Sequence, residues 1–219
     1  HILIDEAHSV PPELWAIFLK QLSFLVKYMS CKVTFISGTM YYPWKNDVVS
    51  AIIGEKINVD PIASVEFSKS SYKEERKRVE ITLEESKFKE AKKICSFVQT
   101  FDGPKIVILN TTKNAAKVAR ELAESLGREN VLHISTALTP KDRKKTLDLV
   151  FEKLNKKSDF ILVGTSCIEC GIDLSFKNGF REINGVAEIF QTSGRVNRGL
   201  EYEQSKLVVF ELEKGEDFT

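Results

Sequence analysis

Residues 105–126 read KIVILNTTKNAAKVARELAESL, and this stretch indicates the fold class most clearly. Its first part, Lys105–Leu109, is almost continuously apolar and predicts a strand that is buried on both faces. Its second part, Thr112–Leu126, carries apolar residues at helical spacing and predicts a helix, which Gly127 can end with a positive φ. A buried strand followed directly by an amphipathic helix is the repeating unit of a parallel α/β sheet.

The same alternation continues on both sides of this stretch. Further strands are expected at Val79–Leu83, Val131–Ile134, Phe160–Val163 and Leu207–Leu212, further helices at Glu84–Gln99 and Pro140–Leu154, and another segment from Val186–Ile189 onward. Before residue 70 we expect strands at His1–Ile4, Lys32–Ile36 and Ser64–Phe67, a helix from Pro11-Pro12 to about Met29, and a short helix at Asp47–Ile53. The pattern predicts an α/β protein with parallel sheets whose two faces are covered by helices.

The segment Lys69–Arg78 differs in composition from the rest of the chain. It is rich in Ser, Lys and Glu and nearly devoid of apolar residues, which indicates an exposed linker. We therefore predict a first domain at residues 1–70, a linker at 71–78 and a second domain at 79–219. The first domain has few strands, and a sheet without its central strands exposes edges and apolar helix faces. We expect it to depend on missing or associated protein for stability.

Composition excludes several classes of protein. Lys and Arg total 32 against 31 for Asp and Glu, so any nucleic-acid site must be a local patch. No apolar run reaches the ~20 residues of a membrane helix, and no signal peptide is visible. Four cysteines are too few for a disulfide framework, and Cys167-x-x-Cys170 supplies only half of a zinc site. These features predict a cytoplasmic protein without a membrane partner.

The loop after the first predicted strand carries Asp5-Glu6-Ala7-His8. In parallel sheets, ligands bind beyond the carboxyl ends of the strands. One carboxylate of such a pair can hold Mg²⁺ through water, and the next can orient or deprotonate an attacking water. The alternative is a solvated carboxylate pair in a turn.

Two further strands end in hydroxyl and amide side chains. Ser37-Gly38-Thr39 could hydrogen-bond a neighbouring loop, although an ordinary turn is the favoured interpretation of these three residues. Asn110-Thr111-Thr112 precedes a helix, whose free N–H groups can bind phosphate, and a structural helix cap explains it equally well.

The last two loops contain glycines and arginines. After the strand at Phe160–Val163, Thr165 could reach a phosphate, and Asp173 could accept a hydrogen bond from a ribose hydroxyl or position a cation. Arg195 and Arg198 share one face if they are helical, and paired guanidiniums can clamp a phosphate and stabilise charge on a γ-phosphoryl group. The alternative is two surface arginines in salt bridges.

The order of these loops resembles motifs II to VI of superfamily 2 helicases over nearly the whole chain. Within that superfamily, the chain is most similar to the helicase part of the CRISPR-associated type I effector nuclease-helicases. The segments that carry this narrower resemblance are ILIDEAHS (2–9), VILNT (107–111), ECGIDL (169–174) and GRVNR (194–198). DEAD-box RNA helicases usually carry glycine where Asn197 stands.

The resemblance implies two RecA-like lobes, the first of them truncated, and a role for each matching residue. Asp5 would bind the Mg²⁺ of Mg·ATP through water, and Glu6 would position or activate the hydrolytic water. The other implied roles are arginine fingers for Arg195 and Arg198, cofactor binding for Gly171, Asp173 and Gln191, coupling for His8, Ser37 and Thr39, and nucleic-acid contact for Asn110, Thr111 and Thr165. ATP would hold the lobes closed and hydrolysis would release them, with the linker as the hinge.

The resemblance also implies a function for the parent protein. The chain is expected to be a fragment of an ATP-dependent helicase or translocase that acts on single-stranded DNA in CRISPR interference. Its implied partners are a CRISPR surveillance complex, an HD nuclease domain or subunit, and a missing N-terminal helicase segment. No Gly-x-x-x-x-Gly-Lys-Ser/Thr loop occurs in the sequence, so the chain alone is expected to be inactive.

Two alternatives remain open from the sequence. The chain could belong to another superfamily 2 helicase that acts on RNA or DNA, because motif II does not distinguish them. It could also be a helicase-like module that binds partners without catalysis. A preference for binding RNA or DNA distinguishes the first alternative from a CRISPR-type DNA translocase, because contacts to a 2′-hydroxyl distinguish RNA from DNA.

Overall fold

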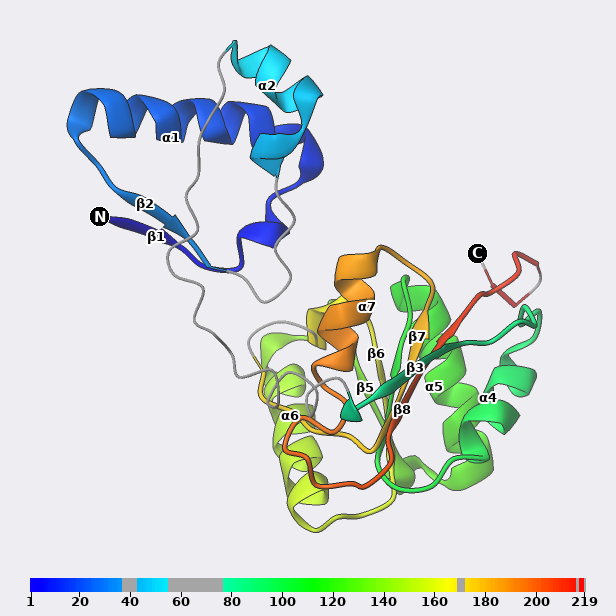
Figure 1. Ribbon diagram of the computed structural model, residues 1–219. Coiled ribbons are helices and arrows are strands. Elements are labelled where there is room, and N and C mark those ends of the chain that lie inside the picture. Colours follow the sequence, from blue (N-terminus) through cyan, green and yellow to red (C-terminus); the bar gives the residue numbers. More distant parts are fainter. Residues whose placement is uncertain (37–42, 55–76, 169–171, 216, 219) are drawn as a thin grey trace. The chain divides into compact units, whose positions relative to one another are not determined.

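The computed structural model describes residues 1–36, 43–54, 77–168, 172–215 and 217–218 (Figure 1). The chain divides into two compact units, residues 1–67 and residues 68–219. We call them the first unit and the second unit.

The first unit contains a small parallel sheet and two helices. Its elements are β1 (Ile2–Ile4), the 3-10 turns η1 (Ala7–Ser9) and η2 (Pro12–Leu14), α1 (Trp15–Met29), β2 (Val33–Phe35), η3 (Pro43–Lys45) and α2 (Asp47–Ile53). The strands pair in parallel, with Ile2 opposite Val33. The Asn46 side chain caps the start of α2, where it accepts a hydrogen bond from the Val48 N–H at 2.9 Å. The predicted helix boundaries for residues 47–53 are confirmed.

The core of the first unit is small. Trp15 and Leu19 of α1 are buried, and the ring centroids of Trp15 and Phe35 lie 6.1 Å apart. The rest of α1 leaves large apolar side chains in solvent, among them Phe24 and Tyr28, whose rings lie 4.9 Å apart. Apolar faces are thus exposed as the sequence predicted, while the dependence of this unit on other protein stays a prediction.

The second unit is built on a six-stranded sheet in which every pairing is parallel. Its strands are β3 (Glu80–Leu83), β4 (Lys105–Ile108), β5 (Val131–Ile134), β6 (Ile161–Gly164), β7 (Asn178–Glu182) and β8 (Lys206–Phe210), in the order β3-β8-β7-β4-β6-β5. The helices are α4 (Ala91–Gln99), α5 (Thr112–Leu126), α6 (Pro140–Asn155) and α7 (Val186–Ser193), with 3-10 turns η4 (Arg128–Asn130) and η5 (Ser166–Ile168). The predicted α/β class and parallel sheet are confirmed.

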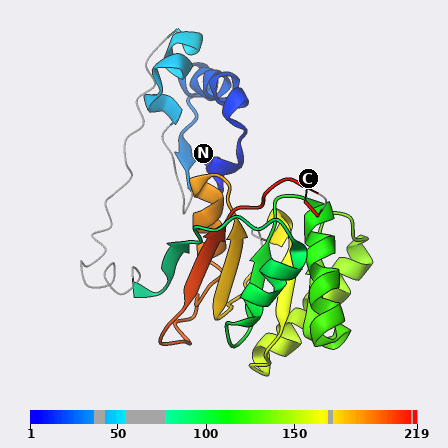
Figure 2. The ribbon, with the colours of Figure 1, turned by 90° about the vertical axis from the view of Figure 1, so that its right-hand side faces the viewer.

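The two faces of this sheet bury separate apolar clusters. All four residues of β4 are buried, because its alternate side chains point to opposite faces and both faces are covered. Val107 packs in the cluster that contains residues of α4 and α5, whereas Ile106 and Ile108 pack in the cluster that contains Val150 of α6. Figure 2 shows the strands side by side with α4 and α5 on one side.

One prediction for the second unit was wrong in part, and one strand was missed. The helix expected from Glu84 begins only at Ala91, because the Phe88 N–H donates to the Glu211 carbonyl at 2.9 Å and the Phe88 ring packs against Phe210. Strand β7 was not predicted at all. Its sequence NGFRE offers one large apolar side chain, and Asn178 and Arg181 are buried through hydrogen bonds instead.

Within the described ranges, no helix has the length and apolar character needed to cross a membrane.

Candidate functional site

Three loops meet at the carboxyl ends of β4, β6 and β7. Asn110, which follows β4, donates its backbone N–H to Glu182 Oε2 at 2.7 Å and its side-chain Nδ2 to the Ile183 carbonyl at 2.9 Å. Asn184 adds a hydrogen bond to Asn110 Oδ1 at 3.2 Å. The loop after β4 is therefore fixed to the loop after β7.

Arg181 of β7 connects this pair of loops to a third. Its side chain is fully buried, with Nη1 donating to Asn110 Oδ1 at 2.8 Å and Nη2 donating to Ser166 Oγ at 3.3 Å. Ser166 directly follows Thr165 in the loop after β6. One guanidinium thus holds Asn110 and the Thr165 loop together. The sequence reasoning missed Arg181, because the strand that carries it lacks an apolar pattern.

The two predicted nucleic-acid threonines have structural partners. Thr111 Oγ1 accepts a hydrogen bond from the Asn114 N–H at 3.1 Å and caps α5. Thr165 is buried, and its Oγ1 lies 3.4 Å from Cys167 Sγ. The helix-cap interpretation of Thr111 is observed, and the contact of both residues with nucleic acid stays a prediction.

The arginine segment does not continue α7. This helix ends at Ser193, so the condition under which Arg195 and Arg198 would share one helical face is not met. Arg198 instead forms an ion pair with Asp173, with Nε 3.1 Å from Oδ1, while Arg195 is half-buried. The structure brings together Asp173 and Arg198, two residues that the sequence assigned to separate loops. The half-buried Gln191 lies on the last turns of α7.

The acidic pair of the first unit follows β1. Glu6 has a left-handed backbone with φ 49°, and its N–H donates to Asp5 Oδ1 at 2.9 Å. Ala7 is buried and its N–H reaches the Ile36 carbonyl at 3.4 Å, which fixes this loop to the end of β2. Both acidic residues are exposed. Adjacent solvent-facing carboxylates are chemically suited to a hydrated Mg²⁺, and Asp5 would hold it.

Comparison with known proteins identifies the region that carries these loops. Residues 102–201 match the family model described as CRISPR-associated nuclease/helicase Cas3, C-terminal. This range is similar to the C-terminal region of that family. A CRISPR-associated nuclease/helicase Cas3 from Haloferax volcanii is 34% identical over 83 residues, which are 37% of this chain and 9% of that protein.

Solved structures share the fold of the Cas3-like region and of the first unit. The crystal structure of T. fusca Cas3-ATP has a TM-score of 0.73 at 19% identity and matches 99% of this chain and 30% of its own. A chain of a CRISPR RNA-guided surveillance complex, pre-nicking, has a TM-score of 0.69 at 18% identity. It matches 98% of this chain and 31% of its own. The crystal structure of the DUF1998 helicase MrfA bound to DNA and AMPPNP has a TM-score of 0.55 at 13% identity. It matches 97% of this chain and 30% of its own. The chain thus spans a small part of each relative.

Several predicted residues lie outside the part of the chain that the structure describes. These are Ser37 and Thr39 of the coupling set, Gly171 of the cofactor set, Cys170 of the cysteine pair, the strand expected at Ser64–Phe67, and residues 71–76 of the predicted linker. His8 falls in η1 by its backbone. Among the described residues, no three His, Cys, Asp or Glu side chains are grouped as a metal site.

A hollow of about 620 Å³ lies at the opposite, amino edge of the six-stranded sheet. It is lined by Phe101, Asp102, Lys177 and Tyr202, among others, and Lys177 pairs with Asp102 at 2.6 Å. None of the predicted site residues lines this hollow, so the loops at the carboxyl edge form the candidate site.

The half-buried carboxyl of Glu182 should make stability depend on pH. Burial raises the pKa of Glu182 above its ordinary 4.5, while the Asn110 N–H and Arg181 act against this rise. The folded state therefore binds this proton more tightly, and the resulting stability is present below pH 4.5 and lost as the pH rises through the raised value. The difference in free energy of unfolding between Glu182→Gln and wild type should therefore shift in favour of the variant as the pH increases. Urea unfolding followed by circular dichroism checks this, with the exposed Glu124→Gln as control.

Gly179 of β7 lets Val196 pack beside the arginines. A Cβ at Gly179 would lie 2.6 Å from Val196 Cγ2 and 3.0 Å from Leu207 Cδ1, and Val196 is fully buried. We expect Gly179→Ala to lower the free energy of unfolding by about 1–3 kcal/mol, as overpacking does. Gly215→Ala, where a Cβ meets nothing within 4 Å, is the matched control in urea denaturation. Equal stabilities for the two variants would contradict this packing.

Proposed function

We propose that the chain is part of a Cas3-like, ATP-dependent helicase or translocase that acts on single-stranded DNA in CRISPR interference. The match of residues 102–201 to the Cas3 C-terminal model carries this proposal, because that range includes Asn110, Thr165, Asp173 and both arginines. Cas3 structures titled with ATP, ADP and AMPPNP support nucleotide binding by the parent protein.

In this proposal, the loops after β1 and α7 supply the chemistry of ATP hydrolysis. Asp5 would hold Mg²⁺ through water, and the ion would neutralise charge on the phosphates. Glu6 would orient the attacking water, and Arg195 and Arg198 would stabilise the charge that develops on the γ-phosphoryl group. Gly171, Asp173 and Gln191 would contact the nucleotide.

The ion pair between Arg198 and Asp173 suits a residue that must change partners. Both side chains are exposed, 48% for Arg198 and 81% for Asp173, so solvent screens the pair. Exposed ion pairs contribute about 0–1 kcal/mol, so a bound nucleotide can draw Arg198 to its phosphates at little cost. Asp173 would then be free to accept from a ribose hydroxyl.

The nucleic-acid strand would run along the loops that Arg181 connects. Asn110, Thr111 and Thr165 would lie near its backbone, and His8, Ser37 and Thr39 would couple strand binding to the nucleotide state. Single-stranded DNA is the proposed strand, and a surveillance complex and an HD nuclease domain are the proposed partners. The similar fold in a solved CRISPR RNA-guided surveillance complex supports the first of these partners.

Hydrolysis measured with different strands tests this function. The parent protein should hydrolyse ATP faster with single-stranded DNA than with an RNA of the same sequence or with no strand. Greater stimulation by RNA would favour another superfamily 2 helicase. Strand binding without hydrolysis would favour a non-catalytic module.

The isolated chain should hydrolyse ATP negligibly even with single-stranded DNA. Its 219 residues contain no Gly-x-x-x-x-Gly-Lys-Ser/Thr loop to cradle the phosphates with backbone N–H groups and a lysine. Phosphate release by purified residues 1–219 is the measurement, with the parent protein as the positive control. Strand-stimulated turnover by the isolated chain would contradict this expectation.

A further inference from the structure

Asn197 lies between the two arginines and is almost completely buried, at 2% exposure. Its Nδ2 donates to the Arg78 carbonyl at 3.1 Å and to the Tyr202 carbonyl at 2.8 Å, and its Oδ1 accepts from the Tyr202 N–H at 3.0 Å. Both N–H donors and the acceptor oxygen of this side chain are therefore used.

The backbone of Asn197 is also constrained. Its φ of 48° lies in the left-handed region, which asparagine tolerates better than most residues other than glycine. Its N–H donates to the Phe176 carbonyl at 2.7 Å, and the neighbouring Val196 is buried beneath the loop. Glycine could keep this backbone turn but would lose all three side-chain hydrogen bonds.

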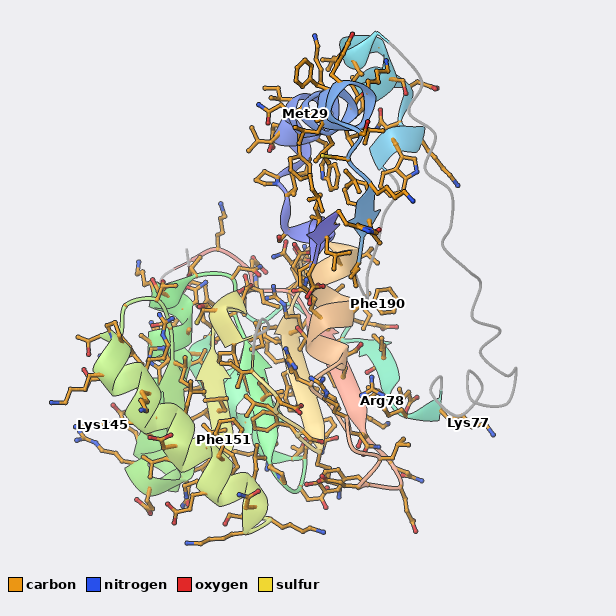
Figure 3. The ribbon with its side chains drawn as sticks, turned by 90° about the vertical axis from the view of Figure 1, so that its left-hand side faces the viewer. Met29, Lys77, Arg78, Lys145, Phe151 and Phe190 are labelled. Atoms are coloured by element: carbon orange, nitrogen blue, oxygen red, sulfur yellow. The ribbon has the colours of Figure 1, made fainter. Side chains whose placement is uncertain are left out.

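Arg78 binds the same loop although it lies more than a hundred residues earlier in the sequence. This residue precedes β3, and its Nη1 donates to the Val196 carbonyl at 2.5 Å while its own carbonyl accepts from Asn197. Figure 3 shows Arg78 against the sheet and the exposed Lys77 at the periphery. Two hydrogen bonds in opposite directions thus join Arg78 to the segment between Arg195 and Arg198.

We propose that Arg78 and Asn197 are positioning residues for ATP hydrolysis, acting as a clamp that fixes the backbone from which Arg195 and Arg198 project. This inference rests on the proposed function. A guanidinium stabilises developing charge best when its position is set before the reaction, and a misplacement of about 1 Å can cost a hundredfold in rate. Because Arg78 lies just before β3, the clamp ties the backbone of the two arginines to the sheet. The position of this backbone is therefore set by the clamp as well as by α7.

The test compares two clamp variants with two matched controls in the parent protein. Arg78→Met and Asn197→Gly should each lower kcat for strand-stimulated ATP hydrolysis about tenfold or more, with KM for ATP changed by less than about threefold. Lys77→Met removes an adjacent exposed charge, and Leu200→Gly alters a second left-handed residue, with φ 56°, that is 61% exposed. Both controls should keep kcat within about twofold of wild type.

Rates are expressed per nucleotide-binding site, counted by titration with a fluorescent ATP analogue, so that loss of folded protein does not imitate loss of catalysis. Wild-type kcat per site in both clamp variants would overturn the inference and leave the proposed function intact. A rise in KM without a fall in kcat would also overturn it. A wild-type parent that binds strand without hydrolysing ATP would overturn the proposed function and this inference together.

Discussion

Replacing Arg198 with alanine in the parent protein should lower kcat for ATP hydrolysis by about a thousandfold, the range typical of an arginine finger. The Arg198 guanidinium forms an ion pair with the exposed Asp173, and it can turn from this solvent-screened partner to a phosphate. In the proposed role, its loss would remove positive charge where negative charge develops in the transition state. Steady-state hydrolysis at saturating single-stranded DNA provides the measurement.

Two controls accompany this variant. Arg120→Ala removes an exposed arginine from α5 and should leave kcat within about twofold of wild type. Asp173→Ala removes the partner of Arg198 without removing the guanidinium, so it should retain far more activity than Arg198→Ala. An Arg198→Ala variant with the kcat of wild type would remove Arg198 from the catalytic set.

Replacing Glu6 with glutamine should lower kcat by about 10²–10⁴-fold, the contribution typical of a general base. Glutamine keeps the shape of the side chain but cannot accept the proton of the attacking water. Asp5, which would hold Mg²⁺, is unchanged, so ATP binding should persist. Hydrolysis and equilibrium binding of a fluorescent ATP analogue, measured on the same protein, separate these two effects.

Glu13→Gln is the matched control, because Glu13 is an exposed carboxylate of the same unit that lies in η2. It should change neither hydrolysis nor binding. A Glu6→Gln variant that loses ATP binding together with hydrolysis would assign Glu6 to nucleotide binding instead of catalysis.

The sequence predicted those strands whose stability comes from apolar burial. In β4 every residue is buried and apolar except Lys105, and the predicted strand agrees with the structure to within one residue. In β7, Asn178 and Arg181 are buried because particular partners satisfy them, and those partners lie far away in the sequence. A pattern of apolar residues carries no information about such partners, so β7 was missed.

The candidate site was predictable in the same limited sense. The rule that ligands bind at carboxyl ends of parallel strands selected the loops of Asn110 and Thr165, which the structure brings together. The guanidinium that joins them belongs to β7, so it could not be foreseen. The contacts of Asn197 with Arg78 likewise depend on where β3 lies beside β8, which short-range spacing does not determine.

The proposed function requires that Glu6 and Arg198 both take part in ATP hydrolysis by the parent protein. A double-mutant cycle with Glu6→Gln and Arg198→Ala in the parent protein tests it most directly, with kcat for strand-stimulated hydrolysis as the readout. Residues that act as a unit on one transition state show strongly non-additive effects. We predict that the double variant is at most about tenfold slower than the slower single variant. Losses that multiply, so that the double variant falls by the product of the two single effects, would contradict the claim.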